Sequence, residues 1–340
     1  MAVFRDVMPA FDLLQPGSAA EAQQLLEQNG ADAWVMAGGL DSFDWLKDRI
    51  KKPKVLVDLS GVDELKGIRV SANGVEIGAM TTLTEIANHA EIKRNYGVLS
   101  QAVELVASPQ IRNQGTLGGN VSQDVRCWYY RGGWPCYRAG GDICYADTPV
   151  GRNREHAIFG ADRCVAVHPS DSVPALIALD AQFVVQTAKG ERVVDAEDYF
   201  VGPETDITRL NMLGPGDLLT AIRIPAAWAG AKFYFEKVRD RNVWDFPLMN
   251  VASATRLSGS GDIEQMRIAV NAVSPRPMRL KAVEDAVRGK PANAETGEMA
   301  GKMAVQGAVP LQFNAYKIPL MRNLVKRAIV GAGPGGREAA

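Results

Sequence analysis

The chain has 340 residues, of which 46% are hydrophobic, and its 38 basic and 39 acidic side chains give a formal net charge of -1. This balance leaves no basic patch or stripe, so the composition disfavours a nucleic-acid-binding protein. No apolar stretch approaches the ~20 residues of a membrane span, and the first residues lack the pattern of a secretory signal. We therefore expect no membrane contact and a protein that is cytoplasmic as synthesised, or periplasmic through export with a signal-bearing partner.

Residues 1–60 predict a small α/β unit. Ser18 and Glu21 have the spacing of a capping box, which opens a helix that ends near Gly30. An apolar stretch at 34–37, a second helix from Ser42 and a buried strand at 55–57 follow.

A second unit is predicted for residues 61–225. It begins with strand alternation at 74–78 and a second capping box, Thr82 to Glu85. A helix at 99–106 with one apolar face follows, and further strands are expected at 164–167, 183–185 and 218–222.

Residues 225–230 have the composition of a domain boundary, and residues 231–330 predict a smaller α+β domain. Three strand patterns, at 232–238, 248–256 and 266–273, come before three helical patterns, and this order is typical of an α+β layer. Residues 331–340 are rich in glycine and predict a flexible tail.

Two glycine-rich turns are candidate phosphate sites. Residues 36–42 join an apolar strand to a helix, where glycines allow close approach of the main chain to an anion and the helix start offers free N–H groups. The turn is neither a GxGxxG fingerprint nor a P-loop, and an ordinary tight turn is the alternative. Residues 115–120 form the second turn, with Thr116 and Asn120 as hydrogen-bonding groups. Two such turns on separate units suggest a dinucleotide whose pyrophosphate is held from both sides.

All four cysteines lie in one segment, at positions 127, 136, 144 and 164. Structural zinc prefers cysteine pairs two to four residues apart, and a thioredoxin-like motif needs Cys-x-x-Cys; neither spacing occurs here. Four thiolates are the ligand count of an iron–sulfur cluster. Zinc and unrelated buried cysteines remain as alternatives at this point.

Several motifs follow the order found in one family. They are Ala37-Gly38-Gly39, Thr81-Thr82, the run from Ile111 to Asn120, and His168-Pro169-Ser170-Asp171. From about residue 4 to 330 the sequence resembles the FAD-binding, or medium, subunits of the xanthine dehydrogenase family, the molybdenum hydroxylases. The cysteine-bearing insertion at 122–164 is most similar to the flavin subunits of periplasmic-type aldehyde oxidoreductases, which carry an extra 4Fe–4S cluster. It is more distantly similar to the medium subunit of 4-hydroxybenzoyl-CoA reductase.

The resemblance implies a fold and a set of site residues. The fold is a two-subdomain FAD-binding fold of the vanillyl-alcohol-oxidase type (1–60 and 61–225), followed by a C-terminal α+β domain (231–330) with a three-stranded sheet and helices. The residues implied in FAD binding are Met36, Ala37, Gly38, Gly39, Leu40, Asp41, Ser42, Thr81, Thr82, Ile111, Gly115, Thr116, Gly118, Gly119, Asn120, Ser122, Asp124, Asp171 and Lys237. The implied ligands of the 4Fe–4S cluster are Cys127, Cys136, Cys144 and Cys164.

Each of three polar residues has a simpler alternative role. In these alternatives, Thr82 and Asp171 each only cap the helix that follows them, and Lys237 is a solvated lysine on a strand. The histidines His89, His156 and His168 are expected to be structural, and no catalytic residue is expected in this chain.

The function implied by the resemblance is electron transfer in an aldehyde-type oxidoreductase. Substrate oxidation would occur at a molybdenum cofactor on a large partner subunit. Electrons would reach this FAD through 2Fe–2S clusters on a small partner subunit and leave to an external acceptor. The alternatives are a stand-alone FAD-dependent oxidoreductase and a zinc-stabilised assembly module without enzymatic activity.

Overall fold

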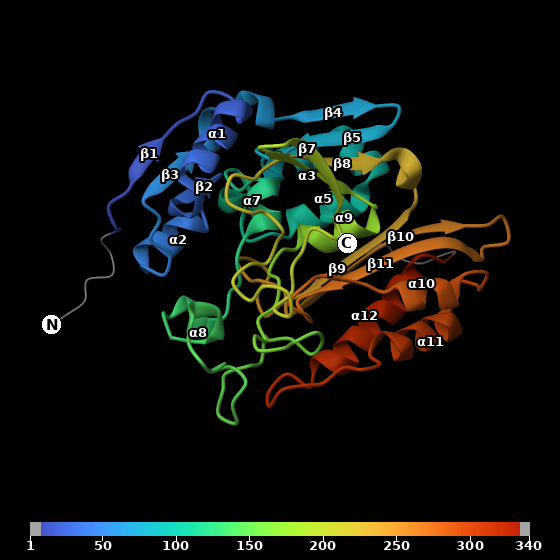
Figure 1. Cartoon of the computed structure of the whole chain (residues 1–340). Coiled ribbons are helices and arrows are strands. Elements are labelled where there is room, and N and C mark those ends of the chain that lie inside the picture. Colours follow the sequence, from blue (N-terminus) through green and yellow to red (C-terminus); the bar gives the residue numbers. More distant parts are fainter. Residues whose placement is uncertain (1–7, 334–340) are drawn as a thin grey trace.

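The computed structural model describes residues 8–333, and its N-terminal unit is a three-stranded parallel sheet with helices (Figure 1). The expectations for residues 1–7 and 334–340 lie outside the described residues. The strand order is β1-β3-β2, with both outer strands parallel to the central one. The elements are β1 (Asp12–Leu14), α1 (Ala19–Asn29), β2 (Ala33–Met36), α2 (Ser42–Lys47) and β3 (Val55–Asp58).

Both predicted helix starts are confirmed. The Ser18 hydroxyl accepts from the backbone N–H of Glu21 at the start of α1. Thr82 and Glu85 form a complete capping box at the start of α3 (Leu83–Asn88), in which each side chain accepts from the other residue's backbone. These local bonds satisfy N–H groups that would otherwise lack partners in the first turn of the helix.

The second unit is a five-stranded antiparallel sheet with order β4-β5-β8-β6-β7. Its strands are β4 (Ile68–Ser71), β5 (Gly74–Gly78), β6 (Gln182–Thr187), β7 (Gly190–Asp195) and β8 (Leu218–Pro225). Its other helices are α4 (Ala90–Asn95), α5 (Gly97–Glu104), α6 (Pro109–Arg112), α7 (Leu117–Ser122) and α9 (Ser172–Ala178).

The C-terminal unit is an antiparallel sheet with order β12-β11-β10-β9, covered on one face by three helices (Figure 1). Its elements are β9 (Lys232–Val238), β10 (Met249–Leu257), β11 (Ile263–Asn271), β12 (Met278–Arg279), α10 (Lys281–Val287), α11 (Ala294–Ala304) and α12 (Lys317–Gly331). The three predicted strands are present, and the two-residue β12 adds a short fourth. The flexible tail predicted to start at residue 331 is wrong for residues 331 and 332, because α12 continues to Gly331 and Ala332 is buried.

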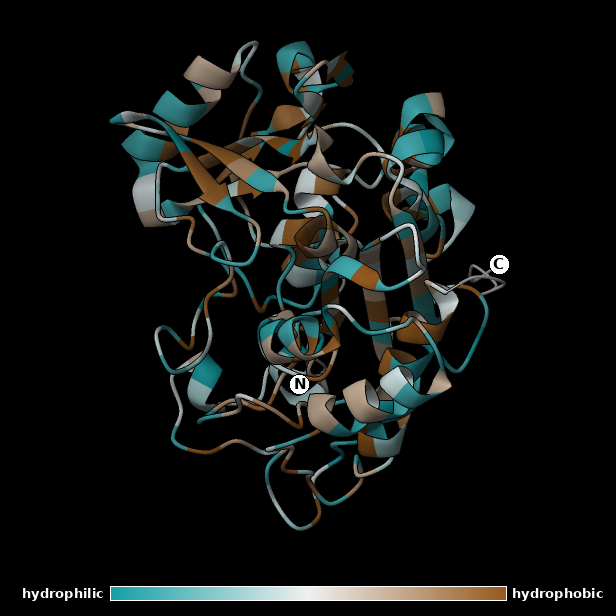
Figure 2. Ribbon diagram, turned by 90° about the vertical axis from the view of Figure 1, so that its right-hand side faces the viewer, coloured by the Kyte–Doolittle hydropathy of each residue, from teal (hydrophilic) through white to brown (hydrophobic). Residues whose placement is uncertain are grey.

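One hydrophobic core joins the second and C-terminal units. Helices α5 and α9 lie between the two antiparallel sheets, and every residue of α9 is buried. A helix that is apolar on all sides is typical of such an enclosed position. In Figure 2 the interior strands are largely brown, whereas the outer helices carry many teal turns. Within residues 8–333 no helix combines the length and hydrophobicity needed to cross a lipid bilayer.

The segment between α7 and α9 contains no strand in the structure. The strand expected at 164–167 is therefore wrong; these residues are extended but pair with no neighbouring strand. Their main chain is held by loop contacts, such as the bond from the Ala157 N–H to the Val165 carbonyl oxygen (2.9 Å). The one α-helix of this segment within the described residues is the short α8 (Trp128–Arg131).

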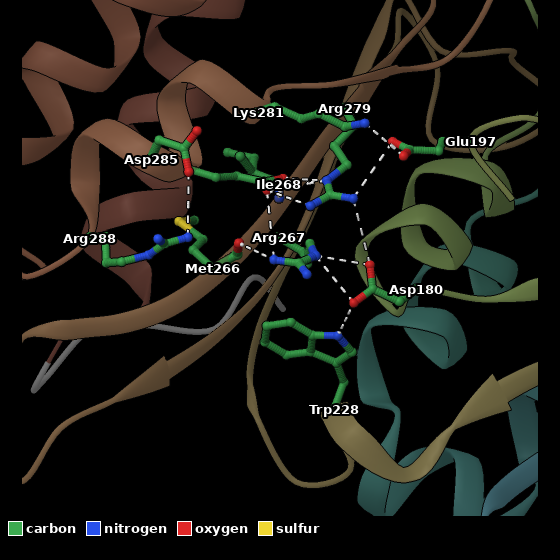
Figure 3. Close-up of polar contacts among 11 residues, drawn as sticks. Asp180, Glu197, Trp228, Met266, Arg267, Ile268, Arg279, Lys281, Asp285 and Arg288 are labelled. Atoms are coloured by element: carbon green, nitrogen blue, oxygen red, sulfur yellow. Dashed lines mark hydrogen bonds and ion pairs between the residues drawn. The ribbon is translucent and has the colours of Figure 1, made fainter. Parts of the chain in front are cut away.

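A charged network ties the second unit to the C-terminal sheet (Figure 3). The Asp180 carboxylate, just after α9, accepts from Trp228 Nε1 (2.6 Å) and from Arg267 Nε on β11 (2.9 Å). Arg279 on β12 lies 3.8 Å from Asp180 and 3.6 Å from Glu197. Asp180 also has a left-handed backbone (φ 49°), which aspartate and asparagine tolerate better than other side chains.

Replacing Asp180 tests this junction. We expect Asp180→Ala to lower the free energy of unfolding by about 2–3 kcal/mol, because two donors lose their acceptor and alanine is strained at this φ. Asp180→Asn keeps the backbone preference and an acceptor, so its loss should be about 1 kcal/mol. Urea unfolding of the purified chain measures both. The exposed Asp285 on α10 pairs with Arg288 at the surface, so Asp285→Asn serves as the control and should change stability by less than about 0.5 kcal/mol.

Candidate functional site

The two predicted glycine turns lie against each other. The Gln114 side chain donates from Nε2 to the Gly38 carbonyl oxygen (2.8 Å). A Cβ atom on Gly38 would lie 2.2 Å from the Gln114 carbonyl oxygen, and a Cβ on Gly118 would lie 2.8 Å from the carbonyl oxygen of Ala79. Main chain meets main chain at both places, so only glycine fits. The turn at 36–42 and the run from Gln114 to Asn120 therefore form one site.

The first turn presents unused backbone donors. Among the described residues, the N–H groups of Gly39, Leu40, Asp41 and Ser42 donate to no protein acceptor. Successive free N–H groups in a turn form a concave site for an anion. Because α2 has only six residues, these amides rather than a helix dipole dominate the site. The Ser42 hydroxyl accepts from Trp34 Nε1 (3.0 Å).

Most of the predicted FAD-binding side chains on the opposite side of the site form hydrogen bonds within the chain itself. Thr81 donates to the Gly67 carbonyl oxygen (2.9 Å), and Thr82 caps α3, as its simpler alternative predicted. Thr116 caps α7 by accepting from the Gly119 N–H (3.1 Å). The Asn120 side chain accepts from Ser170 (2.6 Å) and from Ser172 (2.7 Å). These bonds fix the shape of the second turn.

The remaining predicted residues of this side also have defined positions. The Ile111 carbonyl oxygen accepts from the Gly115 N–H (2.7 Å), and Ser122 lies 2.9 Å from the Tyr199 hydroxyl. Asp124 pairs with Arg138 and lies 3.3 Å from Lys51. Leu40 presents an apolar side chain that is about one third exposed (37%) beside these turns.

Asp171 and Lys237 form a buried ion pair beside the second turn. Lys237 Nζ donates to the Asp171 carboxylate (2.6 Å) and to the carbonyl oxygens of Leu105 (2.9 Å) and Asp245 (2.8 Å). Asn250, the cross-strand partner of Lys237, donates to the other Asp171 oxygen (3.0 Å). The prediction that Lys237 is a solvated strand lysine is wrong, because its side chain is fully buried. The prediction that Asp171 only caps α9 is also wrong, because its side chain makes no capping bond.

All four cysteines line one cavity. The thiols are free, and Cys164 lies close enough to Cys127, Cys136 and Cys144 for their negative forms to interact with its own. Burial raises the pKa of Cys127 to about 12, against the lowering effect of backbone N–H groups at Tyr130 and Tyr129. Burial also raises the pKa of Cys164. Such thiols stay protonated unless a positive centre binds them.

Aromatic rings pack beside the cysteine cavity, and two of them, Tyr129 and Tyr145, line it. Tyr129, Trp134 and Tyr145 pack on one another with ring centroids 4.8–5.9 Å apart. Residues 8–333 contain no group of three or more His, Cys, Asp or Glu side chains placed to hold one metal ion.

Asp41 connects the first turn to the cysteine segment. Its carboxylate accepts from Arg131 and lies 2.9 Å from Arg126, and it also accepts from Trp45 Nε1 (3.1 Å). The Arg131 guanidinium stacks 3.6 Å from the Trp45 ring centroid. Burial lowers the pKa of Arg126 to about 10, so that side chain remains charged at neutral pH.

Sequence reasoning missed several of these partners. Arg126, Arg131 and Lys51 lie in no motif, and nothing in their spacing pointed to Asp41 or Asp124. Gln114 lies in the run from Ile111 to Asn120, but nothing in that sequence pattern indicated its hydrogen bond to Gly38. His156, expected to be structural, lies with Nε2 3.3 Å from the Cys127 sulfur. Burial lowers the pKa of His156 to about 4, helped by the charge of Lys317.

Comparison with known proteins identifies the family. A family model described as the FAD binding domain in molybdopterin dehydrogenase matches residues 9–227, and the CO dehydrogenase flavoprotein C-terminal domain matches residues 233–332. The chain belongs to the FAD-binding subunits of the molybdenum hydroxylases. It is 35% identical over 281 residues to the aldehyde oxidoreductase FAD-binding subunit PaoB of Escherichia coli (strain K12), covering 82% of this chain and 86% of that one.

Two further relatives cover nearly the whole chain. The carbon monoxide dehydrogenase medium chain of Hydrogenophaga pseudoflava is 29% identical over 96% of this chain and 98% of its own. A solved structure of that organism's carbon monoxide dehydrogenase superposes with a TM-score of 0.75 over 95% of this chain and 97% of the other. Quinoline 2-oxidoreductase of Pseudomonas putida 86 gives a TM-score of 0.74 at 25% identity, over 97% and 99%. The predicted fold class and the predicted family are both confirmed.

The contact at Gly38 predicts a loss of flavin on substitution. In Gly38→Ala the new methyl group would meet a main-chain oxygen, which cannot move aside like a flexible side chain, so the two turns must separate. We expect bound FAD per chain to fall at least about tenfold, as measured by flavin absorbance against protein. Gly259→Ala is the control, because its Cβ meets open space, and it should keep its flavin. Full occupancy in Gly38→Ala would contradict the site.

The buried ion pair predicts non-additive stability changes. Lys237→Met leaves the Asp171 carboxylate buried without its cation, so we expect a loss of about 3–5 kcal/mol in the free energy of unfolding. Adding Asp171→Asn removes the stranded charge and should restore more than half of that loss. Urea unfolding measures both, with Lys232→Met at the exposed start of β9 as control. Equal losses in the single and double variants would disprove the coupling.

Proposed function

We propose that this chain is the FAD-carrying electron-transfer subunit of a molybdenum hydroxylase of the aldehyde oxidoreductase type. The observation that carries the proposal is the packing of the Gly38 turn on the Gln114–Asn120 run within a domain of the FAD-binding family. The N–H groups of residues 39–42, next to that contact in the chain, donate to no acceptor among the described residues. Such donors suit the pyrophosphate of a dinucleotide.

The chain's own residues would bind and orient the cofactor. The amides of residues 39–42 would hold the pyrophosphate, and the second turn, fixed by Thr116 and Asn120, would form the opposite wall. The Asp171–Lys237 pair would brace that wall from behind and hold no substrate. FAD supplies one- and two-electron chemistry when bound.

We extend the proposal to a 4Fe–4S cluster on Cys127, Cys136, Cys144 and Cys164. Support comes from the one cavity that all four thiols line, the N–H groups that reach Cys127 and the aromatic wall. A single zinc ion needs its ligands converging on one point, whereas each thiolate of a four-iron cluster binds a different iron. The four thiols that line one cavity match the ligand count of such a cluster.

Partners and substrate belong to the same proposal. A large molybdenum-cofactor subunit would oxidise the substrate, and a small 2Fe–2S subunit would pass electrons to this chain and on to an external acceptor. Aldehydes are the proposed substrate class, because the 35% identical relative is named as an aldehyde oxidoreductase subunit. Relatives named as medium chains indicate multi-subunit enzymes.

Purification of the native complex tests the proposal. The expected result is a coloured complex of three chains with FAD and iron on this one, and aldehyde-dependent reduction of a dye. The isolated chain should not oxidise aldehydes. Turnover by the isolated chain would favour a stand-alone flavoenzyme, and a colourless chain with one zinc ion would favour the assembly module.

Single cysteine replacement separates cluster from flavin. Cys136→Ser removes one thiolate, so we expect the chain to lose most of its iron and sulfide while FAD per chain stays within about twofold of the parent. Iron analysis and flavin absorbance measure the two independently. Trp128→Phe, in the same segment but 65% exposed, is the control and should keep the cluster. Unchanged iron in Cys136→Ser would rule out the ligand assignment.

A further inference from the structure

We propose that His156 is a positioning residue that donates a hydrogen bond from Nε2–H to the Cys127 thiolate and thereby raises the reduction potential of the 4Fe–4S cluster. The inference rests on the cluster proposed above. It assigns a role to a histidine that sequence reasoning regarded as structural.

The contact between His156 and Cys127 is short and enclosed. Nε2 lies 3.3 Å from the cysteine sulfur, and the histidine is only 3% exposed. The other ring nitrogen, Nδ1, has no hydrogen-bond partner among the described residues. A neutral imidazole carries one N–H, and a thiolate can only accept. When the cluster is bound and Cys127 is a thiolate, the Nε2–H tautomer is therefore the one that hydrogen-bonds to it.

Helix α12 holds the histidine in place through the main chain. Asn314, three residues before α12, donates from Nδ2 to the carbonyl oxygens of His156 and Ala157, both at 3.0 Å. Lys317 Nζ donates to the Glu155 carbonyl oxygen (2.8 Å) and to that of Ala272. Both side chains are fully buried. Burying a lysine and an asparagine is costly unless they are bonded, so this clamp fixes the segment firmly.

A second clamp fixes the same segment on its other side. The Asn153 side chain accepts from the Phe313 N–H (2.9 Å) and donates to the Ala146 carbonyl oxygen (2.9 Å). The Ala157 N–H bonds to Val165, next to Cys164. The ring of His156 is thus carried by a segment held at both ends. Such fixed outer groups orient and tune the ligands of a metal centre.

The direction of the effect follows from charge. Reduction adds an electron to the cluster and its thiolates, which strengthens every hydrogen bond donated to sulfur. A donor therefore stabilises the reduced form more than the oxidised form and raises the potential. Losing a bond to a charged sulfur should change the reduction equilibrium about tenfold, which is about 59 mV for one electron.

Redox titration of the purified complex tests this role. The cluster potential is followed by electron paramagnetic resonance of the reduced form in the parent and in His156→Leu and His156→Gln. We expect His156→Leu to keep its iron but to be reduced about tenfold less readily. His156→Gln retains an N–H donor of similar reach and should recover part of the shift. His89→Leu, at the start of α4, is the control and should leave the potential unchanged.

The outcomes are distinct. An unchanged potential in His156→Leu with the cluster intact overturns the inference and leaves the proposed function standing. Loss of iron in both His156 variants also overturns it, because the residue would then be a ligand or a structural support. A parent complex without an iron–sulfur signal overturns the cluster proposal and this inference with it.

Discussion

The contact between main chain and main chain at Gly38 is the constraint on which the rest of the site depends. It brings the edge of the parallel N-terminal sheet against a run that belongs to the five-stranded unit, and no side chain separates them. Gln114 bonds to the Gly38 carbonyl oxygen, and the N–H groups of residues 39–42 donate to no acceptor among the described residues. The proposed anion site would thus depend on how the two units pack and not on either turn alone.

The cysteine segment takes its shape from the same turn. It has no strand, so its geometry comes from side-chain anchors: Asp41 holds Arg126 and Arg131, and Asp124 holds Arg138 and Lys51. These carboxylates are largely buried, which strengthens the pairs and also makes an unpaired member costly. A loop braced in this way can keep four thiols around a cavity before any metal enters it.

Short sequence patterns correctly predicted the features that depend on interactions between residues near each other in the chain. The cap at Ser18, the capping box at Thr82 and the strands and helices of the C-terminal unit follow from short patterns, and the structure confirms them. The order of the motifs predicted the family. Long-range pairs left no such signal: Asp41 and Arg131 are 90 positions apart. Lys237 lies in an ordinary strand pattern, which does not indicate its buried bonds to Asp171 and to the carbonyl oxygens of Leu105 and Asp245. The strand expected at 164–167 failed because no neighbouring strand is available to pair with it.

The double role of Asp41 has a thermodynamic consequence. This residue belongs to the flavin-side turn by sequence and to the cysteine segment by its bonds. Where one anchor orders two ligand sites, linkage requires that occupancy of either site favour occupancy of the other by the same factor. The order in which the two cofactors are inserted would then affect the rate of assembly but not the final affinity for either cofactor. A chain that lacks one cofactor would bind the other less tightly.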